Sequence, residues 1–426
     1  MGLYQNNPIF SHLAPATALT LAALALTLFL VGCGDRADSE SAHEFLLPWP
    51  VADSAEGEYR LQRVQVKGLE DPGRLRGSRA EILSQVQGFH SGRMSGRLAE
   101  PRLAQKDGLW VPKDDRSSMA VALYAHLDRL VRLDEVLTPS RHLRRPRQAA
   151  FELKVQGGRY NQAVYQPKID AIYFSPYRME GLSLAVNGGV IAHEHFHAHF
   201  NEFIIKPLLT QHRQENLPRL NSSGALALRT PADHNWALLR AWNEGLADFW
   251  AYIYGEGSPF LGQSLMGMSA CRIGGPARGG QGLQVIIPGK VQPRFFHPRE
   301  KLTQEPQTLI TSCDLYSLGS RFTRLLQSLA ELNAVQRPAA HGGQVLTHYQ
   351  AMGALILEKL PQVYRSLGPS FAQAEWDPAE LLVLFFQDED LSRESCFLLN
   401  QALDWDPERR EMLQEVCPSE TLEVTD

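Results

Sequence analysis

The fold prediction starts from one stretch, Gly188-Gly189-Val190-Ile191-Ala192-His193-Glu194-His195-Phe196-His197-Ala198-His199-Phe200. Within it, His193 and His197 are four residues apart, in the pattern His-Glu-x-x-His. Residues at this spacing share one face of a helix, so the two imidazoles can bind one metal ion. Glu194 then lies beside the metal, where its carboxylate can accept a proton from a bound water. The stretch predicts a helix that carries a zinc hydrolase site.

A second pair of histidines alternates with the first along the same helix. The i, i+3, i+4 spacing of an apolar face is followed by His193, Phe196, His197, Phe200 and Ile204. We therefore expect the two ligands to lie on the buried side of the helix. His195 and His199 fall roughly opposite. A second metal pair is one interpretation of them, and a solvated or locally hydrogen-bonded pair is the one we expect.

A catalytic zinc needs three protein ligands and an open position for water. The third ligand is predicted in the segment Asn243-Glu244-Gly245-Leu246-Ala247-Asp248. This segment lies in a predicted helix that begins at Thr230-Pro231, an N-cap followed by proline, and ends near Tyr254. Glu244 and Asp248 share one helix face. Glu244 can therefore bind the metal, while Asp248 accepts the free N–H of a ligand histidine.

Composition gives broad limits only. The 426 residues are 44% hydrophobic and 21% charged, which is enough for two or three domains or one large two-lobed domain. The net charge of −5 and the pI of about 6.3 give no indication of a nucleic-acid partner. The one basic cluster, residues 141–147, is expected to be a solvated loop.

The N-terminus has the pattern of an export signal. An apolar run from Ala16 to Val31 is followed by Gly32-Cys33, as in a secretory signal peptide. Cysteine at the cleavage point resembles a bacterial lipobox, which implies that residues 1–32 are removed and that Cys33 carries a lipid anchor. Gly34 after the cysteine implies, by the common sorting rule, the outer membrane. A transmembrane anchor is the alternative. Residues 33–57 are expected to be a flexible tether.

Four further cysteines permit two disulfides in an exported chain, with three possible pairings. Proximity in sequence favours the pairs Cys271–Cys313 and Cys396–Cys417. None of the four has C-x-x-C spacing, so we do not expect a cysteine-based zinc or redox site.

The remaining patterns predict an α+β fold. Strands are predicted at residues 59–66, 149–155, 163–165 and 169–174, and helices at 119–136, 315–332, 347–367, 378–386 and 392–403. Ser117-Ser118 is expected to cap the first of these helices. The expected domains are an N-terminal region of uncertain fold, a catalytic lobe with an antiparallel-edged sheet, a loop-rich connection and a mainly helical C-terminal lobe, over residues 58–115, 116–255, 256–300 and 301–426.

The two motifs together resemble those of the gluzincin clan of metallopeptidases, and within it the thermolysin- and fungalysin-like families. Residues 161–174 resemble the family's edge strand, residues 121–133 the long helix before it, and residues 316–319 a segment in which the family has a histidine at Tyr316. The resemblance spans about residues 117–335. It implies a zincin-like fold, a zinc cofactor and substrate contacts from Gln162 and Ala163.

The resemblance further implies an oxyanion donor at Tyr316, whose phenol could replace the histidine. His234, His297 and His348 are alternatives for this role. The gap between His197 and Glu244 is longer than in thermolysin-like enzymes, and Gln162 replaces an asparagine.

These inferences predict a zinc-dependent endopeptidase in which Glu194 is the general base. Its partners would be a peptide or protein substrate and a membrane, through the lipid on Cys33. Two alternatives stay open, a lipid-anchored binding or scaffold protein with a vestigial peptidase fold and a zinc hydrolase of a non-peptide substrate. The intact Glu194 argues against the first, because a degenerate site does not need the base.

Overall fold

The structure of the chain, a computed structural model, describes residues 42–51, 58–138, 143–153, 160–179, 181–212, 225–257, 309–337, 345–402, 411, 413–414 and 416–417. Residues from Ala42 onward belong to one compact unit. Strands dominate its first part and helices the rest, which confirms the expected α+β class. The signal peptide and Cys33 lie outside the described residues.

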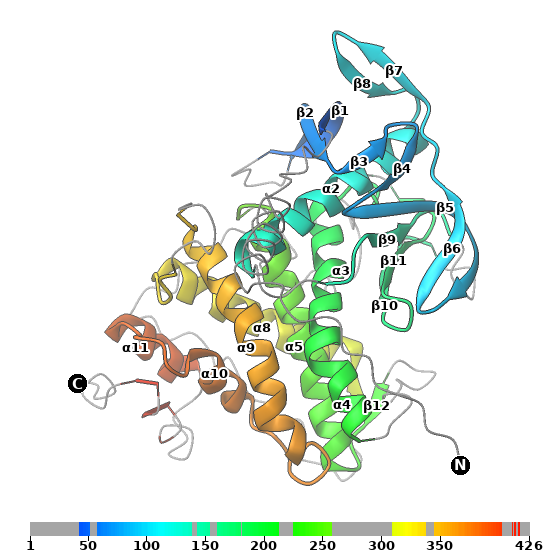
Figure 1. Cartoon of the computed structure of the whole chain (residues 1–426). Coiled ribbons are helices and arrows are strands. Elements are labelled where there is room, and N and C mark those ends of the chain that lie inside the picture. The colour runs from blue at the N-terminus through cyan, green and yellow to red at the C-terminus, as the bar shows by residue number, and fades with distance from the viewer. Residues whose placement is uncertain are drawn as a thin grey trace, which may run out of the picture. The chain divides into compact units, whose positions relative to one another are not determined.

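Two sheets form the N-terminal part (Figure 1). The smaller has the order β2-β1-β8-β7, formed by Tyr59–Lys67, Ala42–Pro50, Leu109–Pro112 and Leu103–Lys106. The larger has the order β10-β11-β9-β5-β4-β3, with β6 also paired to β5; these strands are Ala163–Gln166, Ala171–Phe174, Arg147–Ala150, Ala80–His90, Arg74–Gly77, Leu69–Asp71 and, for β6, Arg93–Leu98. Strands β5, β9 and β11 run parallel, whereas β10 is antiparallel to β11. The larger sheet therefore has the antiparallel edge that the sequence predicts.

The first strand corrects the predicted tether. The tether was expected over residues 33–57, but Ala42–Pro50 forms β1 and pairs along its length with β2. Phe45 and Leu47 are fully buried, so the segment has an apolar face that must be covered. Its two prolines hide this alternation in the sequence. The region of uncertain fold, residues 58–115, consists mainly of strands β2 to β8.

Helix α2 (Asp115–Leu137) contacts strands of both sheets. Its predicted cap is wrong, because the side chain of Asp114 accepts the hydrogen bond from Ser117 N at 2.8 Å. Ser117 Oγ instead accepts from Arg102 N at 2.8 Å. Aspartate at an N-cap satisfies an amide that the first turn leaves free.

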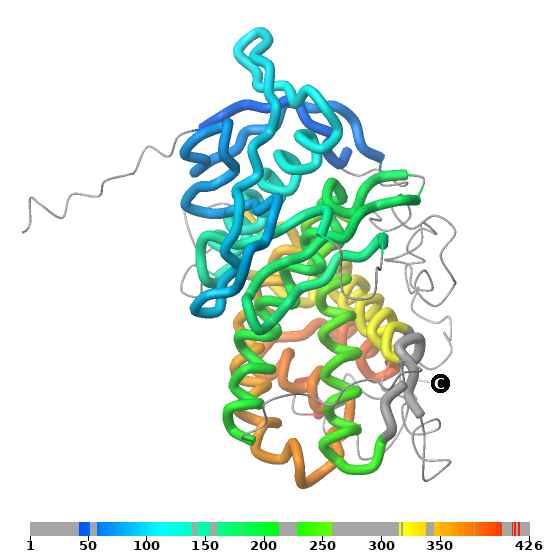
Figure 2. Tube along the Cα trace, turned by 90° about the vertical axis from the view of Figure 1, so that its right-hand side faces the viewer, coloured from blue at the N-terminus to red at the C-terminus, as the bar shows by residue number. Residues whose placement is uncertain are grey.

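The helical part begins with α3 (Gly188–Phe200), which continues through a π-helical turn (Asn201–Ile205) into α4 (Lys206–Gln211). Helix α5 (Pro231–Tyr254) contacts both α3 and α8 (Ser312–Glu331), and α9 (His348–Leu367), a 3₁₀ turn (Gly368–Ser370), α10 (Pro378–Phe386) and α11 (Arg393–Ala402) follow. A short ladder, β12 (Ala225–Ala227) with β13 (Leu309–Thr311), precedes α5 and α8. Figure 2 shows these helices, in green to orange, packed together below the blue strands.

Several predictions about this part are confirmed. Helices α5 and α8 to α11 begin and end close to their predicted bounds. Thr230 caps α5 in a capping box with Asp233. Cys396 and Cys417 form a disulfide with a Cα–Cα distance of 5.6 Å, whereas Cys271 lies outside the described residues. Among the helices that the structure describes, none has the length and apolar character to cross a bilayer.

Candidate metal centre

Three side chains from two helices converge on one point. His193 and His197 project from α3, and Glu244 projects from α5. The two Nε2 atoms are 3.1 Å apart, and His193 Nε2 lies 3.3 Å from Glu244 Oε2. All three residues are half-buried. They could hold a metal ion, and they are the three ligands that the sequence predicts.

The start of α3 is fixed from three directions. The side chain of Asn187 accepts hydrogen bonds from Gly189 N and Val190 N, which caps the helix. Tyr59 OH in β2 accepts from Gly188 N at 2.8 Å. Gly188 cannot carry a side chain, because a Cβ would lie 2.7 Å from the His126 ring. Sheet and helix therefore set the position from which His193 projects.

The other ring nitrogens of the two ligands also have partners. His193 Nδ1 lies 2.9 Å from Asp248 Oδ1, and His197 Nδ1 lies 2.9 Å from Asn243 Oδ1. An acceptor at Nδ1 holds the proton there and leaves the Nε2 lone pair for a metal. Asp248 thus lies where the sequence predicts. Asn243 was not assigned a role, although it stands directly before Glu244 in the quoted segment.

Two carboxylates give the centre a negative potential. Burial opposes a charge on His193, but Asp248 and Glu244 outweigh this and raise the pKa of His193 to about 10. The same potential would attract a divalent cation.

Glu194 connects α3 to the edge of the larger sheet. Its Oε2 accepts a 2.7 Å hydrogen bond from Tyr165 N in β10. Strand residues alternate in the direction of their main-chain groups, so the N–H and C=O of Ala163 point to the same side of β10 as those of Tyr165, away from β11. Gln162 instead pairs inward, where its N donates to Ser175 Oγ at 2.7 Å. Of the two predicted contact residues, only Ala163 therefore offers main-chain groups on this edge.

Helix α8 crosses α5 beside Glu244 through two glycines. A Cβ on Gly319 would lie 2.6 Å from Ala241 O and 3.4 Å from Glu244 Cβ. A Cβ on Gly245 would lie 2.4 Å from Gly319 O. This close approach requires glycine in both helices. It also fixes the position of Glu244 along α5 relative to α8.

The oxyanion role of Tyr316 stays a prediction. Tyr316 lies near the start of α8, three residues before Gly319, and is partly buried. Among the alternatives, His234 is buried and its Nε2 bonds Trp376 O at 3.3 Å. His297 lies outside the described residues.

The second histidine pair is not solvated. His195 and His199 are 0% and 1% exposed. Their Nε2 atoms lie 2.9 and 3.1 Å from the two carboxylate oxygens of Asp134 in α2. Burial would raise the pKa of Asp134, but the two imidazoles outweigh it and hold the pKa well below its ordinary value. The solvated interpretation was wrong because α3 has neighbours on both faces, so its apolar stripe does not mark the only buried side.

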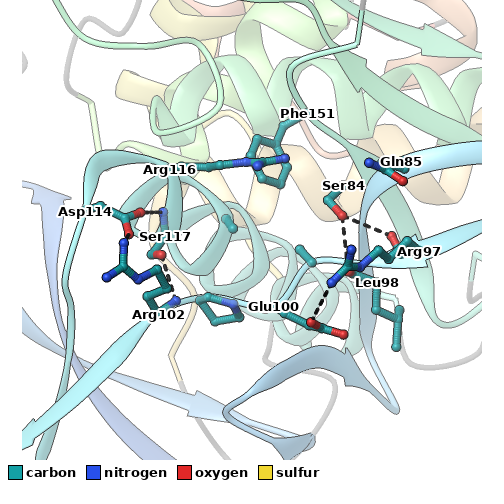
Figure 3. Close-up of a pocket in the computed structure, with 13 residues that line it drawn as sticks. Ser84, Gln85, Arg97, Leu98, Glu100, Arg102, Asp114, Arg116, Ser117 and Phe151 are labelled. Atoms are coloured by element: carbon teal, nitrogen blue, oxygen red, sulfur yellow. Dashed lines mark hydrogen bonds and ion pairs between the residues drawn. The ribbon is translucent and has the colours of Figure 1, made fainter.

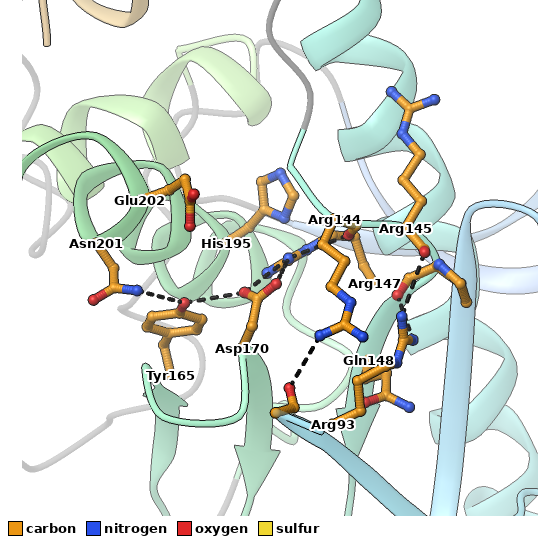
Figure 4. Close-up of polar contacts among 12 residues, drawn as sticks. Arg93, Arg144, Arg145, Arg147, Gln148, Tyr165, Asp170, His195, Asn201 and Glu202 are labelled. Carbon is orange, nitrogen blue, oxygen red and sulfur yellow. Dashed lines mark hydrogen bonds and ion pairs between the residues drawn. The ribbon is translucent and has the colours of Figure 1, made fainter. Parts of the chain in front are cut away.

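The basic cluster is also not wholly a solvated loop (Figure 4). Arg147 lies in β9, is 1% exposed and donates through Nη1 to both oxygens of Asp170, at 2.9 and 2.8 Å. Asp170 Oδ1 also accepts from Tyr165 OH at 3.0 Å, and Asn201 Nδ2 donates to that hydroxyl at 3.4 Å. The figure shows His195 beside this network. The partly exposed carboxylate of Asp170 pairs with this guanidinium and so compensates for its burial.

A separate pocket of about 210 Å³ lies among β5, β6 and the start of α2 (Figure 3). None of the metal-centre residues lines it. Its arginines already have carboxylate partners, since Arg97–Glu100, Arg102–Asp114 and Arg116–Glu152 lie 3.0, 3.7 and 3.0 Å apart. The pocket therefore offers no unpaired cation to a ligand.

Comparison with known proteins adds no assignment. No family model and no curated protein matches the chain. The case for a site depends on the chain's own residues: two imidazoles and a carboxylate at ligand spacing, with a second carboxylate and an amide behind the rings.

Proposed function

We propose that this chain is a zinc-dependent endopeptidase in which His193, His197 and Glu244 bind the metal. The observation that carries the proposal is the convergence of these donors, 3.1 and 3.3 Å apart, next to Glu194. Ligands of a tetrahedral zinc ion at about 2.05 Å lie about 3.3 Å from one another, so the donor set suits this ion. Three protein ligands also leave a fourth position for water, as in catalytic zinc sites.

The proposal includes a zincin-like fold of the gluzincin type. Two features support it. The His-Glu-x-x-His helix runs beside an antiparallel edge strand, β10, and its third ligand comes from a second helix, α5. On α5, Asp248 follows Glu244 by one turn and lies 2.9 Å from His193 Nδ1.

When bound, zinc would polarise the scissile carbonyl and acidify a water molecule. Glu194 accepts the proton of that water and delivers it to the leaving amine. The Tyr165 N–H donates to the Glu194 carboxylate at 2.7 Å, so the position of the proposed base relative to strand β10 is fixed. Asp248 and Asn243 hold the two imidazoles in the tautomer that binds metal. Tyr316 is proposed to donate a hydrogen bond to the oxyanion.

An extended peptide is the substrate that the edge strand suits. Among the strands that the structure describes, β10 ends the larger sheet, and the main-chain groups of Ala163 point away from β11. A peptide could add to this edge as a further strand, bonded through its backbone, with the side chain of Gln162 as a further contact. Because these contacts recognise a backbone and not a side chain, they favour a peptide over a non-peptide substrate.

We also propose that the protein is exported and held by lipid chains on Cys33, at the outer membrane. The lipobox pattern before Cys33 supports this. The membrane is then one partner and a peptide or protein outside the cytoplasm is the other.

The test is a comparison of the wild-type protein with Glu194→Gln in a peptide-library cleavage assay. We expect the wild type to bind zinc and cleave, a chelator to stop cleavage, and added zinc to restore it. Glu194→Gln should keep its zinc and lose about 10²–10⁴-fold in rate, the usual contribution of a general base.

Glu202→Gln is the matched control. Glu202 lies two turns further along the same helical stretch, is exposed and pairs with Lys206 at 3.1 Å, so its loss should leave cleavage unchanged. Retained cleavage by Glu194→Gln would remove this residue from the mechanism. A zinc-loaded wild type that cleaves no peptide would refute the peptidase proposal.

A further inference from the structure

A second set of metal-type side chains lies on the side of α3 away from Glu244. Asp134 of α2 lies 2.9 Å from His195 Nε2 and 3.1 Å from His199 Nε2. The three residues are 2%, 0% and 1% exposed. Their donor atoms are close enough to share an ion, so spacing alone does not separate this set from the metal centre.

The Nδ1 atoms of His195 and His199 distinguish this set of side chains from the metal centre. In the part of the chain that the structure describes, His195 Nδ1 and His199 Nδ1 are buried and have no hydrogen-bond partner. A metal on Nε2 would force the ring proton onto Nδ1, where each N–H would be buried without an acceptor, which costs free energy. With the proton on Nε2, each ring donates to Asp134 and only an acceptor lone pair stays unused. At the metal centre, by contrast, a side-chain oxygen lies 2.9 Å from each Nδ1, that of Asp248 behind His193 and that of Asn243 behind His197.

The charges around Asp134 also argue against a metal ion at this cluster. The Asp134 carboxylate brings one negative charge to the two rings that it bonds. The buried guanidinium of Arg147, which pairs with Asp170, lies near His195 (Figure 4). A divalent ion at Asp134 would leave the cluster positive beside that guanidinium, in a medium where like charges repel strongly.

We propose that Asp134, His195 and His199 form a metal-free brace that fixes the rotation of α3 and thereby aims His193 and His197 at Glu244. The brace deepens the proposed function, since it rests on the metal centre. Each brace histidine is two residues from a ligand, about 200° around the helix. Fixing the side of α3 that carries His195 and His199 therefore fixes the orientation of the side that carries His193 and His197.

The required precision shows why a brace matters. Side-chain tips lie about 5–6 Å from a helix axis, so a 10° rotation of α3 moves each ligand nitrogen by about 1 Å. Functional constellations tolerate only about 0.5 Å. Two charge-assisted hydrogen bonds, donated to one carboxylate from two positions one turn apart, restrict the rotation of α3 more than apolar packing alone.

Two variants separate the brace from a second metal site. In the double variant His195→Gln with His199→Gln, each amide nitrogen stands about where Nε2 was and can still donate to Asp134, but glutamine is a poor zinc ligand. We expect the wild type and this variant each to bind one zinc per chain, with affinities within about threefold. Two zinc ions in the wild type, one of them lost in the double variant, would overturn the proposal.

Asp134→Asn tests the positioning itself. Asparagine has one acceptor oxygen, so only one ring can keep its bond. We expect one zinc per chain, bound about tenfold more weakly, and a changed visible spectrum of the cobalt-substituted protein, which reports ligand geometry. Peptide cleavage does not enter this readout, so a failure of the peptidase proposal leaves it intact.

Asp128→Asn is the matched control. Asp128 lies on the same helix, is fully buried and pairs with Arg79 and Arg132 at 3.4 and 3.0 Å. Its loss should lower the denaturation midpoint but leave zinc affinity and the cobalt spectrum as in the wild type. If Asp134→Asn changes metal binding no more than Asp128→Asn does, Asp134 is a structural residue only and the brace is refuted.

Discussion

Removal of Asp248 offers a quantitative test of the metal centre. Its Oδ1 lies 2.9 Å from His193 Nδ1, and the residue is 1% exposed. Asp248→Ala leaves a buried ring N–H without its acceptor and removes a negative charge behind a proposed metal ligand, His193. Both effects weaken zinc binding, because the ring loses its fixed orientation and some of its basicity.

The magnitude follows from the type of acceptor. A hydrogen bond to a charged group contributes about 1.5–3 kcal/mol, and one between neutral groups about 0.5–1.5 kcal/mol. Asp248→Ala should therefore weaken zinc binding about 10–100-fold, at about 1.4 kcal/mol per factor of ten. Asn243→Ala removes a neutral acceptor at the same 2.9 Å distance, from His197 Nδ1, and should cost about 2–10-fold.

The assay is competition for zinc with a chromophoric chelator at fixed pH, with circular dichroism to show that each variant is folded. Asp248→Asn should fall between the wild type and Asp248→Ala, because the amide oxygen can still accept from Nδ1. Zinc affinity of Asp248→Ala within threefold of the wild type would refute the assigned role. A larger loss in Asn243→Ala than in Asp248→Ala would refute the argument from charge.

Three further predictions concern stability and the edge strand. Burial lowers the pKa of His126 to about 3, so the unfolded chain binds a proton that the folded chain does not. The free energy of unfolding should therefore fall as the pH drops below about 6.5, by up to about 1.4 kcal/mol per pH unit. Urea titrations at pH 7 and pH 5 should show a smaller fall in this free energy for His126→Gln than for the wild type. Gly319→Ala would force its Cβ against Ala241 O, at 2.6 Å, and should lower stability by about 1–3 kcal/mol in the same titration. Ala163→Pro removes an N–H on the side of β10 away from β11 and should raise the KM for peptides at unchanged zinc content. Val164→Pro removes an N–H that faces β11, so it should lower the urea midpoint of unfolding. Equal midpoints of the two variants would contradict the strand assignment.

The sequence predicts the convergence of His193, His197 and Glu244 well because its geometry is mostly local. His193 and His197 are one turn apart on a single helix, as are Glu244 and Asp248, so the 3.6-residue period brings each pair together without knowledge of the fold. The long helices are predicted for the same reason. The contact between the two pairs is not local, and only the resemblance to a known motif pair suggested it.

The missed features depend on segments far apart in the chain. Asp134 meets His195 and His199 through packing of α2 on α3, and the N–H of Tyr165 meets Glu194 through the sheet edge. An isolated aspartate in an amphipathic helix has no pattern that foretells a buried partner. Arg147 was expected at the surface with its basic neighbours, and only the position of Asp170 explains its burial. Strand β1 was missed because prolines and acidic flanks outweighed its alternation.

The two histidine pairs of α3 differ in the features by which we distinguish a proposed metal ligand from a structural histidine. Both pairs have i, i+4 spacing, both face a carboxylate from another helix, and both place three donor atoms within reach of one ion. They differ in exposure, since His193 and His197 are half-buried and His195 and His199 are not exposed. They differ also at Nδ1: in the first pair a side-chain oxygen lies 2.9 Å from each Nδ1, whereas in the part of the chain that the structure describes the Nδ1 atoms of His195 and His199 have no hydrogen-bond partner. Because a ring that binds metal through Nε2 must keep its proton at Nδ1, the acceptor behind the ring decides the assignment that the sequence spacing leaves open.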